Sequence, residues 1–151
     1  MSKYKVAVLM GSASDQDKMA PAAEMLGKFG VEVDVHVMSA HRTPEKVATL
    51  ARNARADGYG AIICGAGMAA HLAGAVAAQT TLPVIGVPLS GGALDGVDAL
   101  YSTVQMPRGI PVATVAVNGS GNAALLAVQM FAITDPELAA ALDAHRVEMA
   151  G

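Results

Sequence analysis

The chain alternates short apolar runs with longer stretches in which apolar and polar residues are mixed. The short runs predict strands, at residues 4–10, 31–38, 60–64, 83–87 and 112–117. The longer stretches predict helices, at residues 15–29, 43–57, 69–79, 94–104, 122–133 and 136–149. Because strands and helices alternate and most strands are apolar throughout, the pattern predicts a parallel sheet covered by helices on both faces.

The expected fold is an α/β domain of three layers, in which a doubly wound, five-stranded parallel sheet has the flavodoxin-like order 2-1-3-4-5. A further helix is expected at the C-terminus. We expect residues 1–151 to form a single domain, because this length suffices for one core and no linker or repeat interrupts the pattern. In such a sheet, ligands bind outside the carboxyl ends of the strands, where the strand order reverses.

Local signals refine the expected elements. Asp15 and Thr43 precede predicted helices and are expected to act as N-caps. The strand at residues 31–38 alternates apolar and polar residues, so its polar side chains, His36 among them, are expected on a wetter face. His145, in the last predicted helix, is expected to be structural or solvated.

Composition narrows the class of protein. Hydrophobic residues make up 53% of the chain and charged residues 15%, which excludes a disordered chain. So much apolar surface exceeds what a monomer of this size buries, so we expect copies of the chain to associate. A net charge of −3 argues against nucleic acid as the main partner, because a phosphate backbone requires a basic face.

The location of the protein follows from simple signals. The chain has one cysteine, Cys64, in an apolar run; it is expected to be a buried residue in a reducing compartment. Residues 4–10 are too short for a secretory signal, and no uninterrupted stretch of about 20 apolar residues predicts a membrane span. We therefore expect a cytoplasmic protein without membrane contact.

Three segments carry the candidate chemistry: GSASD at residues 11–15, SAHRTP at 39–44 and GAGMAAHL at 65–72. They follow the first three strands, so the topology brings them to one crevice. Together they supply hydroxyls, one carboxylate, one guanidinium, backbone amides and two imidazoles. This combination suits a phosphorylated, hydroxylated small molecule and a proton transfer.

Individual residues fit such roles, although each has an ordinary structural alternative. Arg42 is suited to clamp a phosphate, and Asp15 can accept hydrogen bonds from ribose hydroxyls. His41 lies at a helix start, where the helix dipole favours a neutral, proton-accepting imidazole. The alternatives are a capped turn at residues 11–15, an exposed loop histidine at position 41, and a capping or hydrogen-bonding role for His71.

Several familiar sites are absent from the sequence. No lysine of a phosphate-binding P-loop follows the first strand, and no G-x-S-x-G nucleophile elbow occurs. Residues 65–70 match the dinucleotide fingerprint G-x-G-x-x-A, but they follow the third strand and no acidic residue lies about 20 positions later. The histidines and the single cysteine do not have metal-ligand spacing, so no metal site is expected.

Taken together, these segments closely resemble the PurE family of purine biosynthesis over nearly the whole chain. The resemblance is carried by GSASD, SAHRTP and GAGMAAHLAG (residues 65–74), and by LPVIGVP (82–88), GVDALYSTVQMPRGIPVAT (96–114) and NAALLA (122–127). Of these, SAHRT and QMPRGIP are highly specific. The family has a mutase branch and a branch that carboxylates aminoimidazole ribonucleotide with free carbon dioxide, and Arg42 with AAHL at residues 69–72 resembles the mutase branch.

The resemblance implies an N5-carboxyaminoimidazole ribonucleotide mutase in which His41 is the general acid and base. It places Ser39 and Arg42 at the phosphate, with Ser12 nearby, and Asp15 at the ribose. The implied substrate-binding residues are Gly11, Ser12, Ser14, Asp15, Ser39, Ala40, Arg42, Gly67, Ala70, His71 and Leu72. It also implies a homo-octamer that uses neither a metal nor an organic cofactor.

The chain departs from the family pattern at several positions. Met68 replaces a glycine and Ala73 a proline; if position 68 needs a positive φ, Met68 is strained, and otherwise its side chain fills part of the pocket. After the fourth strand the family usually has Gln-Ser or a similar pair, whereas this chain has the run LSGG at residues 89–92. The loop at 118–121 is about two residues short. The alternative functions are a carboxylase that uses free carbon dioxide and a non-catalytic nucleotide-binding module.

Overall fold

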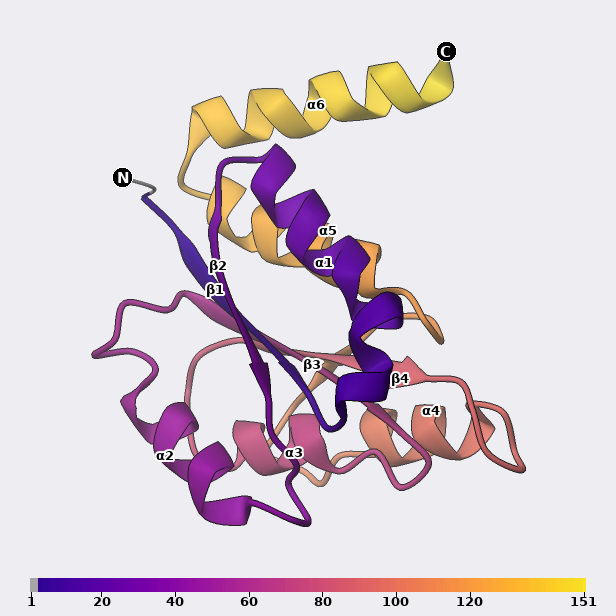
Figure 1. Cartoon of the computed structure of the whole chain (residues 1–151). Coiled ribbons are helices and arrows are strands. Elements are labelled where there is room, and N and C mark those ends of the chain that lie inside the picture. The colour runs from indigo at the N-terminus through magenta and orange to yellow at the C-terminus, as the bar shows by residue number, and fades with distance from the viewer. Residues whose placement is uncertain (1–2) are drawn as a thin grey trace.

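A computed structural model describes residues 3–151, and within this range strands and helices alternate along the chain (Figure 1). The strands are β1 (Lys5–Met10), β2 (Glu32–Val37), β3 (Ala61–Gly67), β4 (Val84–Leu89) and β5 (Ala113–Thr114). The helices are α1 (Gln16–Lys28), α2 (Pro44–Asn53), α3 (Leu72–Ala77), α4 (Val97–Val104), α5 (Ser120–Ala132) and α6 (Pro136–Ala150), with a 3-10 turn η1 (Ala13–Asp15) before α1.

The strands form one parallel sheet in the order β2-β1-β3-β4-β5, which confirms the predicted order. Side chains of β1 alternate between the two faces. Val6 and Val8 belong to the core formed with α1 and α5, whereas Ala7 and Leu9 belong to the core formed with α2 and α3. Helix α6 packs against α5 outside the sheet layers, as Figure 1 shows. The predicted three-layer fold with a C-terminal helix is therefore confirmed.

Several element boundaries differ from the prediction, among them those of β3, α3 and β5. Strand β3 continues to Gly67, because Gly65 and Gly67 take extended conformations and pair with Val87 and Leu89 of β4. Helix α3 is correspondingly shorter than predicted and begins at Leu72. Strand β5 has only two residues, since the chain leaves the sheet edge soon after pairing with β4.

The expectation of a wetter polar face on β2 is wrong. The side chains of Val35 and Val37 are 51% and 46% exposed, whereas His36 is partly buried. The Nε2 atom of His36 is buried and has no hydrogen-bond partner among residues 3–151. Strand β2 is at the edge of the sheet, and the core on the α1 side reaches Val33 but not the two valines that follow it.

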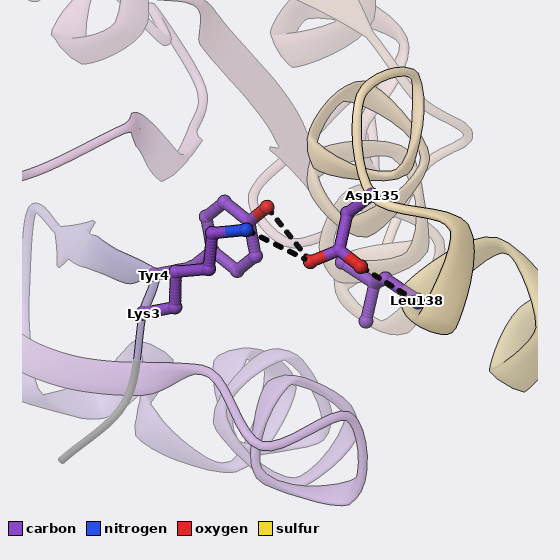
Figure 2. Close-up of polar contacts among 4 residues, drawn as sticks. All are labelled: Lys3, Tyr4, Asp135 and Leu138. Atoms are coloured by element: carbon purple, nitrogen blue, oxygen red, sulfur yellow. Dashed lines mark hydrogen bonds and ion pairs between the residues drawn. The ribbon is translucent and has the colours of Figure 1, made fainter.

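Asp135 connects the start of α6 to the start of β1 (Figure 2). Its Oδ1 accepts a hydrogen bond from the Leu138 amide at 3.2 Å, so Asp135 caps the helix. Its Oδ2 accepts a hydrogen bond from the Tyr4 hydroxyl at 2.9 Å and lies 3.6 Å from the Lys3 ammonium (Figure 2). The Leu138 amide first, and then the Tyr4 hydroxyl, hold the pKa of Asp135 below its ordinary value.

A second polar cluster joins β1, β2 and Tyr59, which lies two residues before β3. The Asp34 carboxylate accepts a hydrogen bond from the Tyr59 hydroxyl at 2.6 Å and lies 2.9 Å from the Lys5 ammonium. Lys5 also lies over the Tyr59 ring, 4.5 Å from its centroid. The Tyr59 hydrogen bond and then the Lys5 hydrogen bond lower the pKa of Asp34.

Two further features complete the fold. Cys64 lies in β3 with 1% of its surface exposed, and burial raises the pKa of its thiol. His145 of α6 is also buried and packs edge-on against the Phe29 ring, with centroids 5.5 Å apart, which fits the structural role expected for it. Among residues 3–151, no helix combines the length and apolar character needed to cross a membrane.

Candidate active site

A cavity of about 460 Å³ opens where β1, β2, β3 and β4 end. Parallel strands place their carboxyl ends at one edge, so the loops that follow them surround a common space. The lining residues are Gly11, Ser12, Ser14, Asp15, Lys18, Ser39, Ala40, His41, Arg42, Ala66, Gly67, Met68, Ala69, His71, Leu72, Ser90, Gly91 and Gly92. The cavity therefore brings together all but one of the site residues expected from the sequence.

The first loop follows β1 and presents two hydroxyls. Ser12 Oγ accepts a hydrogen bond from the Ser14 amide at 3.3 Å and lies 2.9 Å from Ser14 Oγ. Asp15 occupies the N-cap position of α1, but its side chain makes no capping hydrogen bond, so the capping prediction is wrong in this respect. Ser12 caps the preceding 3-10 turn instead, and Asp15 is one of the residues that line the cavity.

The second loop follows β2 and forms a tight turn. Ser39 Oγ accepts hydrogen bonds from the amides of His41 at 3.3 Å and Arg42 at 3.1 Å. Thr43 Oγ1 accepts from the Ser39 amide and donates to the Ser39 carbonyl, both at 3.0 Å. Thr43 therefore closes this turn rather than capping α2 as predicted. The turn leaves the side chains of His41 and Arg42 exposed at the cavity.

The third loop follows β3 and joins it to α3. Met68 has a φ of 52°, so the position needs the left-handed region and the side chain there is strained. Ala70 is buried and does not line the cavity; its amide donates to Ser102 Oγ at 2.9 Å and anchors the loop. His71 occupies the N-cap position of α3 without a side-chain capping bond, and Leu72 is buried at the cavity wall.

Two imidazoles from different loops meet in this cavity. The ring centroids of His41 and His71 are 5.8 Å apart and the rings are tilted by 31°. Both side chains are exposed, so both can reach a bound molecule. A pair of neighbouring imidazoles in the lining of a cavity is suited to general acid and base catalysis.

Lys18 and residues 90–92 line the cavity although the sequence did not assign them to the site. The Lys18 ammonium donates to the Ser90 carbonyl at 2.6 Å, and the Ser90 amide donates to Asn118 Oδ1 at 3.0 Å. The contact crosses from α1 to the loop after β4, so no local pattern around Lys18 could have revealed it. The departure from the family pattern at residues 89–92 was the only feature of the sequence that pointed to this part of the cavity lining.

The charges of the cavity define what it can bind. Lys18 and Arg42 contribute two cations, and Asp15 contributes the one carboxylate of the lining. The serine hydroxyls and the amides at the start of α1 add neutral donors. Such a site suits an anion with hydroxyl groups, and the histidine pair adds a means of moving a proton.

This fold and cavity define an α/β protein with a candidate small-molecule site at the strand ends, and the comparisons identify its family. Residues 5–151 match the model of the AIR carboxylase family, so the chain belongs to that family. The predicted PurE resemblance is confirmed by the crystal structure of Treponema denticola PurE, with a TM-score of 0.89 and 33% identity. The structural match covers 98% of this chain and 92% of the Treponema denticola chain.

Two curated relatives show how this chain compares in length. The N5-carboxyaminoimidazole ribonucleotide mutase of Mycobacterium tuberculosis (strain H37Rv) is 53% identical over 146 residues, covering 97% of this chain and 84% of that protein. The phosphoribosylaminoimidazole carboxylase of Schizosaccharomyces pombe is 55% identical over 144 residues, covering 95% of this chain. The chain spans only 26% of that fungal protein's length.

Proposed function

We propose that this protein is an N5-carboxyaminoimidazole ribonucleotide mutase of purine biosynthesis. It moves a carboxylate from the exocyclic nitrogen of its substrate to ring carbon 4, giving 4-carboxy-5-aminoimidazole ribonucleotide. The observation that carries the proposal is the cavity in which His41 lies beside His71 and between anion-binding loops. The sequence of this chain is 53% identical to that of a mutase of similar length from Mycobacterium tuberculosis, which supports the same function.

The second loop has the groups needed to hold the substrate phosphate. Ser39 Oγ accepts hydrogen bonds from two backbone amides, which leaves its hydroxyl hydrogen free to donate to a phosphate oxygen. Arg42 adds a guanidinium that can form two parallel hydrogen bonds to the same group. Ser12 lies on the neighbouring loop of the cavity, and Ala40 lines it between the two anion-binding residues.

The first and third loops hold the remainder of the nucleotide in this proposal. Asp15 and Ser14 hydrogen-bond the ribose hydroxyls, while Gly11 lets the substrate approach the backbone at the end of β1. The third loop encloses the base and the migrating carboxylate. Its contacts come from Gly67, His71 and Leu72, and the buried Ala70 contributes by fixing the loop through Ser102.

The chemistry proposed for this site is a decarboxylation followed by a carboxylation. The bond between the exocyclic nitrogen and the carboxyl carbon breaks, releasing carbon dioxide, and the nitrogen takes up a proton. Ring carbon 4 then attacks the retained carbon dioxide, and His41 removes the proton from this carbon. One proton is taken up and one is given up, so the conversion balances without a metal ion or an organic cofactor.

Exposed apolar side chains support assembly of this protein into a homo-octamer, as part of the same proposal. One group lies on and just before α4: Leu94, Val97, Tyr101 and Val104. Another comprises Val35 and Val37 on the edge strand β2. Sedimentation velocity is expected to give the mass of eight chains, and a stable monomer would contradict this part. A cytoplasmic location is also proposed, and cell fractionation tests it.

The function is tested by offering two substrates to the purified protein and following both spectrophotometrically. One is N5-carboxyaminoimidazole ribonucleotide without added bicarbonate, and the other is aminoimidazole ribonucleotide with saturating bicarbonate. Rapid conversion of the first at low carbon dioxide is expected. Conversion of only the second would assign the protein to the carboxylase branch, and binding without conversion of either would indicate a nucleotide-binding module.

A further inference from the structure

Met68 occupies an unusual position at the mouth of the cavity. Its φ of 52° is in a region that side-chain-bearing residues seldom adopt, yet its side chain is 61% exposed. Because most of the Met68 side chain is exposed, its burial offsets little of this backbone strain. Strain of this kind is characteristic of functional sites, so the position invites a functional explanation.

The Met68 side chain lies on Gly92, across the cavity mouth from its own loop. A Cβ atom added to Gly92 would lie 3.2 Å from Met68 Cγ and 3.3 Å from Met68 Sδ. Gly92 also has a positive φ of 69°. The absence of a side chain at Gly92 therefore provides the space that the Met68 side chain uses.

The loop that carries Gly92 is firmly held on both sides. The Gly91 amide donates to Asp95 Oδ1 at 3.2 Å, and the Asn118 side chain binds both the amide and the hydroxyl of Ser90. Lys18 holds the Ser90 carbonyl. The backbone against which Met68 packs is therefore held in place by hydrogen bonds. The unbranched side chain of Met68 can still change its rotamer.

We propose that Met68, resting on Gly92, is the apolar cover that retains carbon dioxide between the two halves of the reaction. This inference rests on the proposed mutase function. In that reaction the anionic carboxylate becomes a neutral, apolar molecule that no ion pair can hold. An adaptable thioether side chain at the mouth slows its escape and excludes water while ring carbon 4 attacks.

The cover is tested with a substrate that carries ¹³C in its migrating carboxylate, in buffer containing unlabelled bicarbonate. The wild-type protein is expected to transfer nearly all of the label to ring carbon 4. Met68→Gly relieves the backbone strain but removes the cover, so it is expected to release several-fold more free aminoimidazole ribonucleotide per turnover, above the uncatalysed rate. Met68→Leu keeps an apolar side chain and is expected to retain most of the label.

A second variant tests the contact between the two residues. Gly92→Ala places a methyl group against Met68 and is expected to raise the loss of label. The same substitution in a Met68→Gly background is expected to add little, because the displaced side chain is already gone. Should Met68→Gly fail to fold, Met68→Asn replaces it, since Asn tolerates a positive φ and offers no apolar cover.

The outcomes separate this inference from the function on which it rests. Normal turnover with equal label retention in Met68→Gly and the wild type overturns the cover alone. Independent, multiplying effects of the two substitutions also overturn it. A wild-type protein that converts no substrate overturns the mutase function and the cover together.

Discussion

The two ends of the sheet use their polar side chains in opposite ways. At the amino ends, Asp135 and Asp34 each accept a tyrosine hydroxyl and lie beside a lysine. At the carboxyl ends, the side chains of Asp15, His41 and Arg42 make no hydrogen bond or ion pair within residues 3–151. Charged groups are therefore paired with one another at the amino ends, whereas Asp15, His41 and Arg42 are left available at the carboxyl ends. Lys18, which donates to the Ser90 carbonyl, is the exception there.

This difference separates a region that contributes to stability from one that contributes to function. Paired groups stabilise the fold, because each carboxylate has lost water but gained donors in return. Groups left facing a cavity bring the protein little stability, and their interactions become favourable only when a ligand arrives. Substitutions at the two ends should consequently separate stability from activity.

The sharpest test at the carboxyl end is His41→Asn. This change removes the group proposed to move the proton, so the turnover number is expected to fall by about 10²- to 10⁴-fold. Nucleotide binding and the Tm are expected to remain close to those of the wild type. His36→Asn, outside the cavity, serves as the control, and near-normal turnover in His41→Asn would remove His41 from its role.

Arg42→Ala tests whether the same end binds the phosphate. Loss of a charge-assisted contact is expected to weaken nucleotide binding about tenfold or more, without a comparable loss of stability. Titration calorimetry with the nucleotide and with its dephosphorylated nucleoside measures this effect. Arg52→Ala, near the end of α2 and outside the cavity lining, is the matched control. An equal loss of affinity for the nucleoside would contradict the assignment.

At the amino end, Asp135→Ala is expected to lower stability and to leave activity unchanged, the reverse of the substitutions at the carboxyl end. It removes the cap of α6 and the hydrogen bond from Tyr4, so the Tm is expected to fall by a few degrees while KM and the turnover number stay unchanged. Thermal unfolding and a standard assay measure the two effects. Asp143→Ala removes an equal charge from the exposed side of α6 and is expected to leave the Tm nearly unaltered; an equal fall in both variants would refute the pairing.

The smallest expected effect concerns Tyr59→Phe, which removes one hydrogen bond to Asp34. Because the Asp34 side chain is 37% exposed, the free energy of unfolding at pH 7 is expected to fall by only about 1 kcal/mol. The folded-state pKa of Asp34 is lowered. Its contribution is therefore present above the unfolded pKa of about 3.9 and is lost as the pH falls through the folded pKa.

Urea unfolding at neutral pH and at about pH 3 measures this dependence. The difference between Tyr59→Phe and the wild type is expected to shrink at the acidic pH. A difference of equal size at both values would show that Tyr59 stabilises the fold by packing rather than through the charged Asp34.

The sequence was sufficient for the fold because apolar strand runs and intervening helices leave few topologies. It also identified the crevice, since loops after neighbouring parallel strands must meet. It could not reveal that β3 continues through Gly65, because glycine suits both a turn and an extended strand. That choice depends on pairing with Val87 of β4, which is a contact made only in the folded chain.

The remaining misses have the same physical origin. Lys18 enters the cavity through packing of α1 beside the loop after β4, and local sequence does not encode that contact. Thr43 was a reasonable cap, but the Ser39 backbone competes for its hydroxyl. The faces of β2 were assigned from alternation, although exposure there depends on how far α1 extends over Val35 and Val37.

The buried Cys64 gives this protein an internal reporter of opening of the core on one face of the sheet. It is the one cysteine of the sequence, and its buried thiol lies in the core between the sheet and helices α2 and α3, with a raised pKa. Since the thiolate is the reactive form, a thiol reagent can modify the folded chain only when this core opens. The rate of labelling therefore measures how often the core under α2 and α3 opens, and the change in that rate compares the stability of this layer in any two variants without added denaturant.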